Sequence, residues 1–185
     1  MKLKLIVIFF IIFISKNLYS DETSKWLKGE IDIILEAYKN QNLSNENRFL
    51  LIEKTINNNF AGTGIAKFVA GEAWKKSDKS TKKIYIDNFK RHLALNIASM
   101  MQGYSDQTYE LTKSKYDSKN QVTLIDMEIF SDTGSVVVTW RVKESKDRFY
   151  VIDLIVADIS LVVTKRSEFN SCLLYTSPSP RDGRE

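Results

Sequence analysis

Apolar residues recur at steps of three and four through the first half of the chain, a spacing that predicts amphipathic helices. The first predicted helix begins at Thr23 or Ser24 and ends near Tyr38. The second begins at Ser44, whose side-chain oxygen can accept a hydrogen bond from the first free backbone N–H groups. Three asparagines at positions 57–59 end it. We therefore expect two helices near the start of the domain.

The longest predicted helix follows a turn and a short helix. Residues 61–64 are expected to form the turn and residues 65–70 the short helix, with Gly71 as its C-terminal stop. A helix that begins after Ser77 then runs to about Gly103. Apolar residues on one of its faces form a continuous stripe. These residues are Ile86, Phe89, Leu93, Ile97, Met100 and Tyr104.

The second half of the chain alternates apolar and polar residues at every other position, which predicts strands. Four strands are expected, around residues 109–111, 125–129, 136–142 and 149–156. The sequence Asp-Thr-Gly at 132–134 gives the clearest hairpin signal. Helices followed by strands favour an α+β fold. An NTF2-like cone fits this order, with N-terminal helices packed over a curved, mainly antiparallel sheet of about four strands.

The last strand is the most informative stretch of the chain. Residues 149–156 are apolar or aromatic at nearly every position, interrupted by Asp153, which is typical of a strand buried on both faces. Asp158 and Ser160 then supply capping oxygens just before Leu161, so we expect a C-terminal helix to begin there. Elements elsewhere in the chain must cover both faces of this strand.

The two ends of the chain differ from the domain between them. Residues 1–20 have a basic start, an apolar run of about ten residues and a polar end, the pattern of a secretory signal peptide. The alternative is an anchor helix, but a bilayer span needs ~20 apolar residues. Residues 172–185 read like one frame of a common transposase sequencing adapter, the alternative being a natural tail. We therefore expect a domain over 21–171 whose C-terminal helix is truncated.

Charge and cysteine content change once both ends are set aside. The full chain has a formal net charge of +4, but residues 21–171 contain 22 Lys and Arg against 21 Asp and Glu, a net of +1. This balance argues against a nucleic-acid partner. The only cysteine, Cys172, lies in the excluded tail. A domain without cysteine is compatible with an oxidising compartment, which an exported protein would enter.

Few residues suggest catalysis or metal binding. The single histidine, His92, borders the apolar stripe of the long helix and is expected to flank it rather than act as a base. No His or Cys spacing matches a metal site. The glycines at 62 and 64 do not follow a strand, so they are not a phosphate loop. The lysine pairs at 75–76 and 82–83 are expected on a solvated surface, or facing lipid headgroups or an acidic partner.

Asp153 is the one carboxylate in an apolar strand. A buried carboxylate needs a partner or a raised pKa. We expect a structural ion pair with Arg166, a candidate cation in the helix that follows the strand. The alternative is a catalytic base in a hydrophobic cone, an arrangement that some NTF2-like enzymes use.

Two blocks of the sequence resemble the MlaC family, also called the toluene-tolerance or ABC-transporter auxiliary family. The first block is FYVIDLIVADISLVVTKRSEF at 149–169, and the second is FAGTGIAKFVAGEAWKK at 60–76. The blocks occur in the family order, about eighty residues apart. Asp158 replaces a family glycine that can require a positive φ, and Ala61 replaces a family aspartate.

The resemblance implies a carrier without an enzymatic activity or a cofactor. Family members are periplasmic proteins that carry phospholipid between an outer-membrane lipoprotein complex and an inner-membrane ABC transporter, which maintains outer-membrane lipid asymmetry. Burying acyl carbon contributes ~0.8 kcal/mol per methylene, so such a carrier needs a deep apolar pocket. The alternative to a carrier is a secreted interaction domain in which side chains fill the interior of the cone and leave no large cavity. The candidate lining residues are Phe68, Val69, Phe89, Leu93, Ile97, Met100, Val138, Trp140, Ile152 and Leu154.

Overall fold

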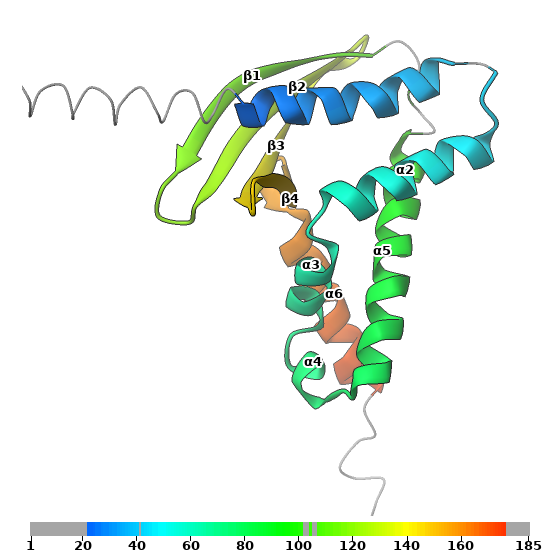
Figure 1. Cartoon of the computed structure of the whole chain (residues 1–185), viewed down its shortest axis with the longest axis vertical. Helices are drawn as coiled ribbons and strands as arrows, with labels where there is room; N and C mark the ends of the chain where they lie inside the picture. Colours follow the sequence, from blue (N-terminus) through cyan, green and yellow to red (C-terminus); the bar gives the residue numbers. More distant parts are fainter. Residues whose placement is uncertain (1–21, 41, 102–103, 105–106, 177–185) are drawn as a thin grey trace, which may run out of the picture.

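The helical first half and the strand-rich second half are both present in the computed structural model, which describes residues 22–40, 42–101, 104 and 107–176. The expected signal peptide and the last nine residues of the expected adapter segment lie outside these ranges. A helix over residues 22–39 crosses one face of the sheet (Figure 1). The helices that follow it in the first half are α2 (Asn45–Asn59), α3 (Gly62–Ala70), α4 (Glu72–Lys76) and α5 (Lys79–Met101).

Local hydrogen bonds explain where these helices begin and end. Ser44 caps α2, because its Oγ accepts a hydrogen bond from the Asn47 N–H at 3.2 Å. Gly71 ends α3 with a φ of +55°, a conformation that suits glycine. The expected turn at 61–64 is wrong in part, because α3 begins at Gly62. A side chain at Gly62 would meet Lys90 at 3.0 Å, so this glycine lets α3 approach α5 closely.

The sheet has the order β1-β2-β3-β4-β5 with antiparallel neighbours. The four expected strands are present, and a fifth strand of two residues follows them. The turn between β3 and β4 places Lys146 and Asp147 at φ values of +53° and +58°, as a tight hairpin turn requires. The strands are β1 (Thr108–Asp117), β2 (Val122–Ser131), β3 (Gly134–Ser145), β4 (Arg148–Val156) and β5 (Ile159–Ser160).

The turn between β4 and β5 contains position 158, where the resembling family has a glycine. Ala157 and Asp158 have φ values of +48° and +64°, so the family glycine that Asp158 replaces would occupy a left-handed conformation. Ser160 then caps α6 (Leu161–Thr176), because its Oγ accepts a hydrogen bond from the Val163 N–H at 3.1 Å. The helix therefore begins where expected, and it continues past residue 171 into the segment excluded on sequence grounds.

Replacing Asp158 with glycine is expected to stabilise the protein. The left-handed conformation costs an L-residue about 1–2 kcal/mol, a cost that glycine avoids. Glycine also loses more conformational entropy on folding, which reduces this gain by about 0.5–1 kcal/mol. We expect Asp158→Gly to raise the free energy of unfolding by about 0.5–1 kcal/mol in urea titrations. The same substitution at Asp87, inside α5, should lower it by about 1 kcal/mol. A loss of stability in Asp158→Gly would contradict the assigned turn.

Two clusters of buried side chains hold the helices and the sheet together. In the first cluster, the helix over 22–39 packs on the sheet through Leu27 and Ile31 against Ile125, Val142 and Val151. In the second cluster, Ile52 and Ile56 of α2 pack against Ala94 of α5. Phe60 is half-buried at the edge of both clusters.

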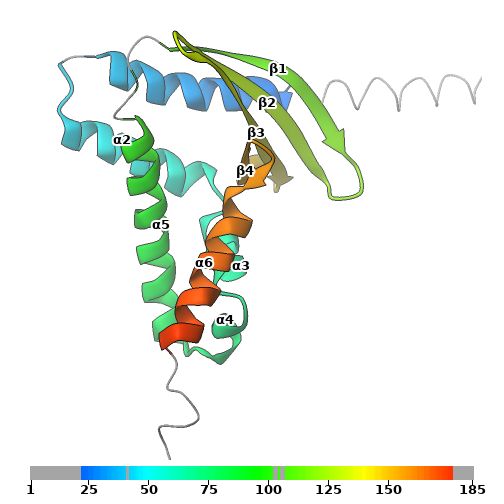
Figure 2. The same ribbon diagram turned by 180° about the vertical axis from the view of Figure 1, so that it is seen from behind.

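Helix α5 is unusual because Ala94 is its only fully buried residue. It packs against α2 and α3, and α3 packs in turn against α6. Figures 1 and 2 show α5 and α6 extending away from the sheet on the same side. Within the described ranges, no helix combines the length and the apolarity needed to cross a membrane. The apolar stripe of α5 is only partly covered by protein, because Leu93 and Ile97 pack against the second cluster while Met100 is 68% exposed.

Candidate apolar binding site

A first cavity lies between the sheet, the helix over 22–39 and the C-terminal end of α5. Its volume is about 180 Å³, and its lining is almost entirely apolar. Strands β2, β3 and β4 form one wall and the two helices form the opposite wall. The apolar residues that line it are Ile31, Ile34, Leu35, Ile97, Met100, Met101, Tyr104, Tyr109, Met127, Ile129, Val138, Trp140, Leu154, Val156 and Leu161.

A second cavity of about 350 Å³ continues from the first, between α5, α6 and β4. Ile97, Met100, Leu154 and Leu161 line both cavities, so the two form one hollow, referred to below as the joined cavity. The volume of the second part alone lies within the roughly 300–1,000 Å³ typical of small-molecule sites. The apolar stripe of α5 faces this space, which explains why the helix buries so little of it against protein.

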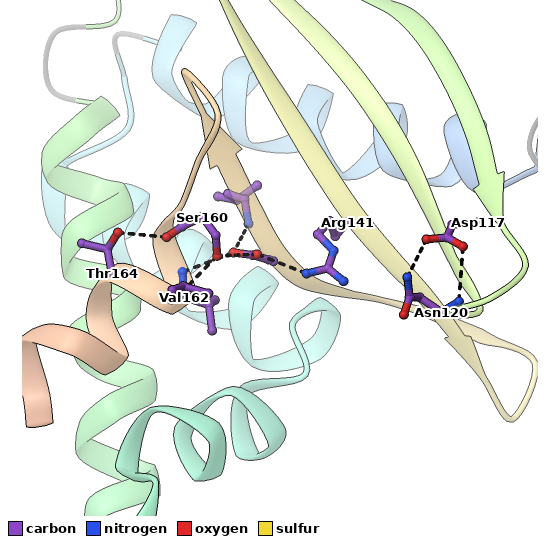
Figure 3. A network of polar contacts seen from close by, with 9 residues as sticks. Asp117, Asn120, Arg141, Ser160, Val162 and Thr164 are labelled. Carbon is purple, nitrogen blue, oxygen red and sulfur yellow. Dashed lines mark hydrogen bonds and ion pairs between the residues drawn. The ribbon is translucent and has the colours of Figure 1, made fainter.

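A buried carboxylate fixes the wall where the sheet meets α6. Asp153 is 4% exposed, and its Oδ1 accepts hydrogen bonds from the Leu154 N–H at 2.9 Å and the Val162 N–H at 3.2 Å. Its Oδ2 accepts from the Ser160 hydroxyl at 2.7 Å and from Arg141 Nη1 at 3.5 Å. In Figure 3, Arg141 approaches from β3, while Ser160 and Val162 approach from the junction of β5 and α6.

The expected ion pair of Asp153 with Arg166 is wrong. Arg141 is the cation beside Asp153, directly opposite it on the neighbouring strand. Arg166 instead donates a hydrogen bond to the Phe68 carbonyl oxygen at 2.9 Å, and its guanidinium lies 4.5 Å from the centre of the Phe68 ring. Arg141 lies twelve residues before Asp153 and Arg166 thirteen residues after it, so separation along the sequence does not decide between them, and cross-strand pairing does.

These contacts give Asp153 an anchoring role. A carboxylate has about four lone-pair sites, and four donors surround this one. No lone pair is left to take a proton from a substrate, so the geometry does not favour Asp153 as a catalytic base. His92 is exposed, with its Nε2 3.0 Å from Asn96 Nδ2. No group of side chains among the described residues has the composition of a metal site.

The family model of the MlaC protein matches residues 29–177, which is most of the chain and includes both the sheet and the helices around the cavity. This chain belongs to the MlaC family. No curated protein matches the sequence. A solved structure is similar in fold: the phospholipid-binding protein from Ralstonia solanacearum in complex with a phospholipid, with a TM-score of 0.72 and 16% identity. The match covers 84% of this chain and 88% of the Ralstonia chain.

Most of the residues expected to line a pocket in this MlaC-family chain lie on the joined cavity. Phe89, Leu93, Ile97 and Met100 of α5 line it from one side. Val138, Trp140 and Leu154 line it from the sheet. These seven positions border the hollow, and their role as lipid contacts stays a prediction.

Three expected lining residues lie elsewhere. Val69 is buried in α3 and borders a further cavity between α5 and α6 rather than the joined cavity. Phe68 lines a separate surface pocket with Ile152. The position of Ile152 has a clear cause, since a β-bulge separates Asp153 from Val151 in the pairing of β3 with β4. The bulge adds one residue and reverses the alternation of faces. Val151 and Leu154 consequently share the inner face, and Ile152 faces away from it.

The sequence interpretation missed one wall of the cavity. The helix over 22–39 contributes Ile31, Ile34 and Leu35. These residues are spaced by three and four, as on any amphipathic helix, and they were not among the expected lining residues. Ile31 packs in the first buried cluster and also borders the cavity. A stripe on its own gives no signal that distinguishes a filled space from an empty one.

A polar cluster joins the outer strand to this helix beside the first cavity. The Tyr109 hydroxyl donates a hydrogen bond to Asp32 Oδ1, and Lys28 Nζ lies 2.6 Å from Asp32 Oδ2. Burial raises the pKa of Tyr109, and the Asp32 carboxylate raises it further. Burial also tends to raise the pKa of Asp32, but the hydrogen bonds from Lys28 and Tyr109 outweigh it and lower that pKa. Tyr109 therefore donates as a neutral phenol at neutral pH.

Proposed function

We propose that this chain binds phospholipid and holds its acyl chains in the joined cavity. The observation that supports the proposal is the cavity itself, which is apolar, continuous across two volumes and bordered by the stripe of α5. An empty apolar hollow of this size lowers the stability of the fold, because its walls lack the dispersion contacts that a packed interior would have. A ligand that supplies those contacts would explain why the hollow is there.

The energetics of transfer support an acyl chain as the ligand. Each methylene buried contributes ~0.8 kcal/mol, so a chain of ten methylenes would gain about 8 kcal/mol on entering such a cavity. Membership of the MlaC family and the fold shared with a phospholipid-binding protein support the same choice. The proposal includes no chemical step, consistent with the role of Asp153 as an anchor.

We further propose that the chain is a periplasmic carrier. In this role it would move phospholipid between an outer-membrane lipoprotein complex and an inner-membrane ABC transporter, and so maintain outer-membrane lipid asymmetry. The signal-peptide pattern at residues 1–20 supports export, and the MlaC family membership supports the two partners.

Native mass spectrometry of the gently purified domain tests the binding proposal. We expect a fraction of the protein to retain phospholipid, seen as adducts that dissociate to the apo mass and to lipids identifiable by fragmentation. An unrelated exported protein of similar size, purified in parallel, controls for lipid carried over from the membrane. Repeated absence of adducts, together with failure to load from vesicles, would contradict the proposal.

A further inference from the structure

A third cavity extends the hollow along the cleft between α5 and α6. Its volume is about 400 Å³, and it shares Phe89, His92 and Lys165 with the second cavity. Figure 2 shows α5 and α6 side by side at this level, with α3 behind them. The three cavities therefore adjoin one another in a row that begins under the sheet and ends between the two helices, and the row is called the cleft below.

The polarity of this cleft changes along its length. The lining under the sheet is almost entirely apolar. Between α5 and α6 the lining gains Asn96 and Ser99 and then Asn88, together with the shared His92 and Lys165. The Asp153 carboxylate also borders the second cavity, where four donors already occupy its oxygens. A site that is apolar at one end and polar at the other matches an amphipathic ligand, which has an apolar part and a polar part.

We propose that the α5–α6 end of the cleft binds the phosphate group of the lipid whose tails fill the joined cavity. This inference rests on the proposed function, and it fixes the direction in which the lipid lies. Lys165 of α6 supplies the cation. From the facing helix, the amide of Asn96 supplies a neutral hydrogen-bond donor, and its Nδ2 also lies 3.0 Å from His92 Nε2. An ammonium group and neutral donors on two sides of a cleft are the chemistry that recognises a phosphodiester.

Lys165 is free to change partner. Its Nζ lies 2.9 Å from Glu168 Oε2, one turn further along the same helix, and the two side chains are 42% and 55% exposed. Exposed pairs of this kind contribute little to stability, so a phosphate can replace the carboxylate as the partner of the ammonium. Glu168 also borders the third cavity, and its charge would keep the phosphate near Lys165 and Asn96 rather than further down the cleft.

The test compares two lipids that share their acyl chains. Phosphatidylglycerol has the phosphate and diacylglycerol lacks it, and loading of each from vesicles is measured by mass spectrometry. We expect the unmodified protein to load phosphatidylglycerol about five- to tenfold better than diacylglycerol, given the strength of charge-assisted hydrogen bonds. Lys165→Gln should remove most of this preference while leaving diacylglycerol loading unchanged, and Lys165→Arg should retain it. Lys79→Gln, at the exposed start of α5, is the matched control.

The outcomes separate this inference from the proposed function. Equal loading of both lipids by the unmodified protein and by Lys165→Gln would overturn the phosphate assignment and leave the tail cavity intact. Failure of the unmodified protein to load either lipid would overturn the proposed function. Inorganic phosphate serves as a third probe in calorimetry. Binding of phosphate alone as tightly as phosphatidylglycerol would identify a free-phosphate site and overturn the assignment to a lipid headgroup.

Discussion

Replacing Ile97 with tryptophan is expected to weaken lipid retention by about tenfold or more while the domain remains folded. Ile97 borders both parts of the joined cavity, so a larger side chain there fills the passage between them. The indole would exclude roughly two methylenes of lipid, a loss of about 1.6 kcal/mol or ~10-fold in affinity, and more if it closes the passage. Loading from phospholipid vesicles, measured by native mass spectrometry, checks this effect.

A matched variant separates blocking the cavity from disturbing the helix. Leu95 lies on the same helix, is 49% exposed and lines no described cavity, so Leu95→Trp should load lipid normally. Ile97→Trp should also melt within a few degrees of the parent, because the hollow accommodates the added volume. Overpacking a filled core costs about 1–3 kcal/mol instead. A large loss of stability in Ile97→Trp, or normal lipid loading, would contradict the assigned cavity.

Replacing Asp153 with asparagine is expected to be the most destabilising conservative change in the chain. The carboxylate accepts from two backbone N–H groups, a hydroxyl and a guanidinium, and an amide presents its own donors to some of these groups. Removing one partner from a buried ion pair costs about 3–5 kcal/mol. We expect Asp153→Asn to lower the free energy of unfolding by about 3 kcal/mol in urea titrations.

The control for this prediction is Asp87→Asn in α5. Asp87 forms an exposed pair with Lys83 at 2.8 Å, and such pairs contribute at most about 1 kcal/mol. The difference between the losses of unfolding free energy in the two variants measures how much burial and the four hydrogen-bond donors add to the stabilising effect of the carboxylate. A change below about 1 kcal/mol in Asp153→Asn would show that the carboxylate does not anchor α6 to the sheet.

Much of the fold could be predicted because local signals determine it. Ser44 and Ser160 mark helix starts through their side-chain oxygens, and Gly71 marks a helix end. Such capping signals act over a few residues, so one sequence is enough to detect them. The positive φ at position 158 could be expected only from the resemblance to the family, in which a glycine stands there.

The candidate site was less predictable because it depends on register and on empty space. The bulge beside Ile152 reverses the faces of β4, and no residue type in that strand indicates a bulge. Arg141 reaches Asp153 only through cross-strand pairing, which proximity along the chain does not show. Ile31, Ile34 and Leu35 have the spacing of any amphipathic helix face, which does not tell whether that face meets protein or a cavity. Periodicity identifies the face that avoids water, and tertiary packing decides whether that face meets protein or a cavity.

Fluorescence quenching by phospholipids with brominated acyl chains tests most directly whether lipid tails occupy the cavity. Trp140 borders the hollow from β3, and bromine quenches indole only at close range. Brominated phospholipid should therefore quench tryptophan emission relative to the same lipid without bromine, and Trp140→Phe should remove the difference. Equal emission with both lipids, under conditions in which mass spectrometry detects bound lipid, would place the tails outside this cavity and contradict its assignment.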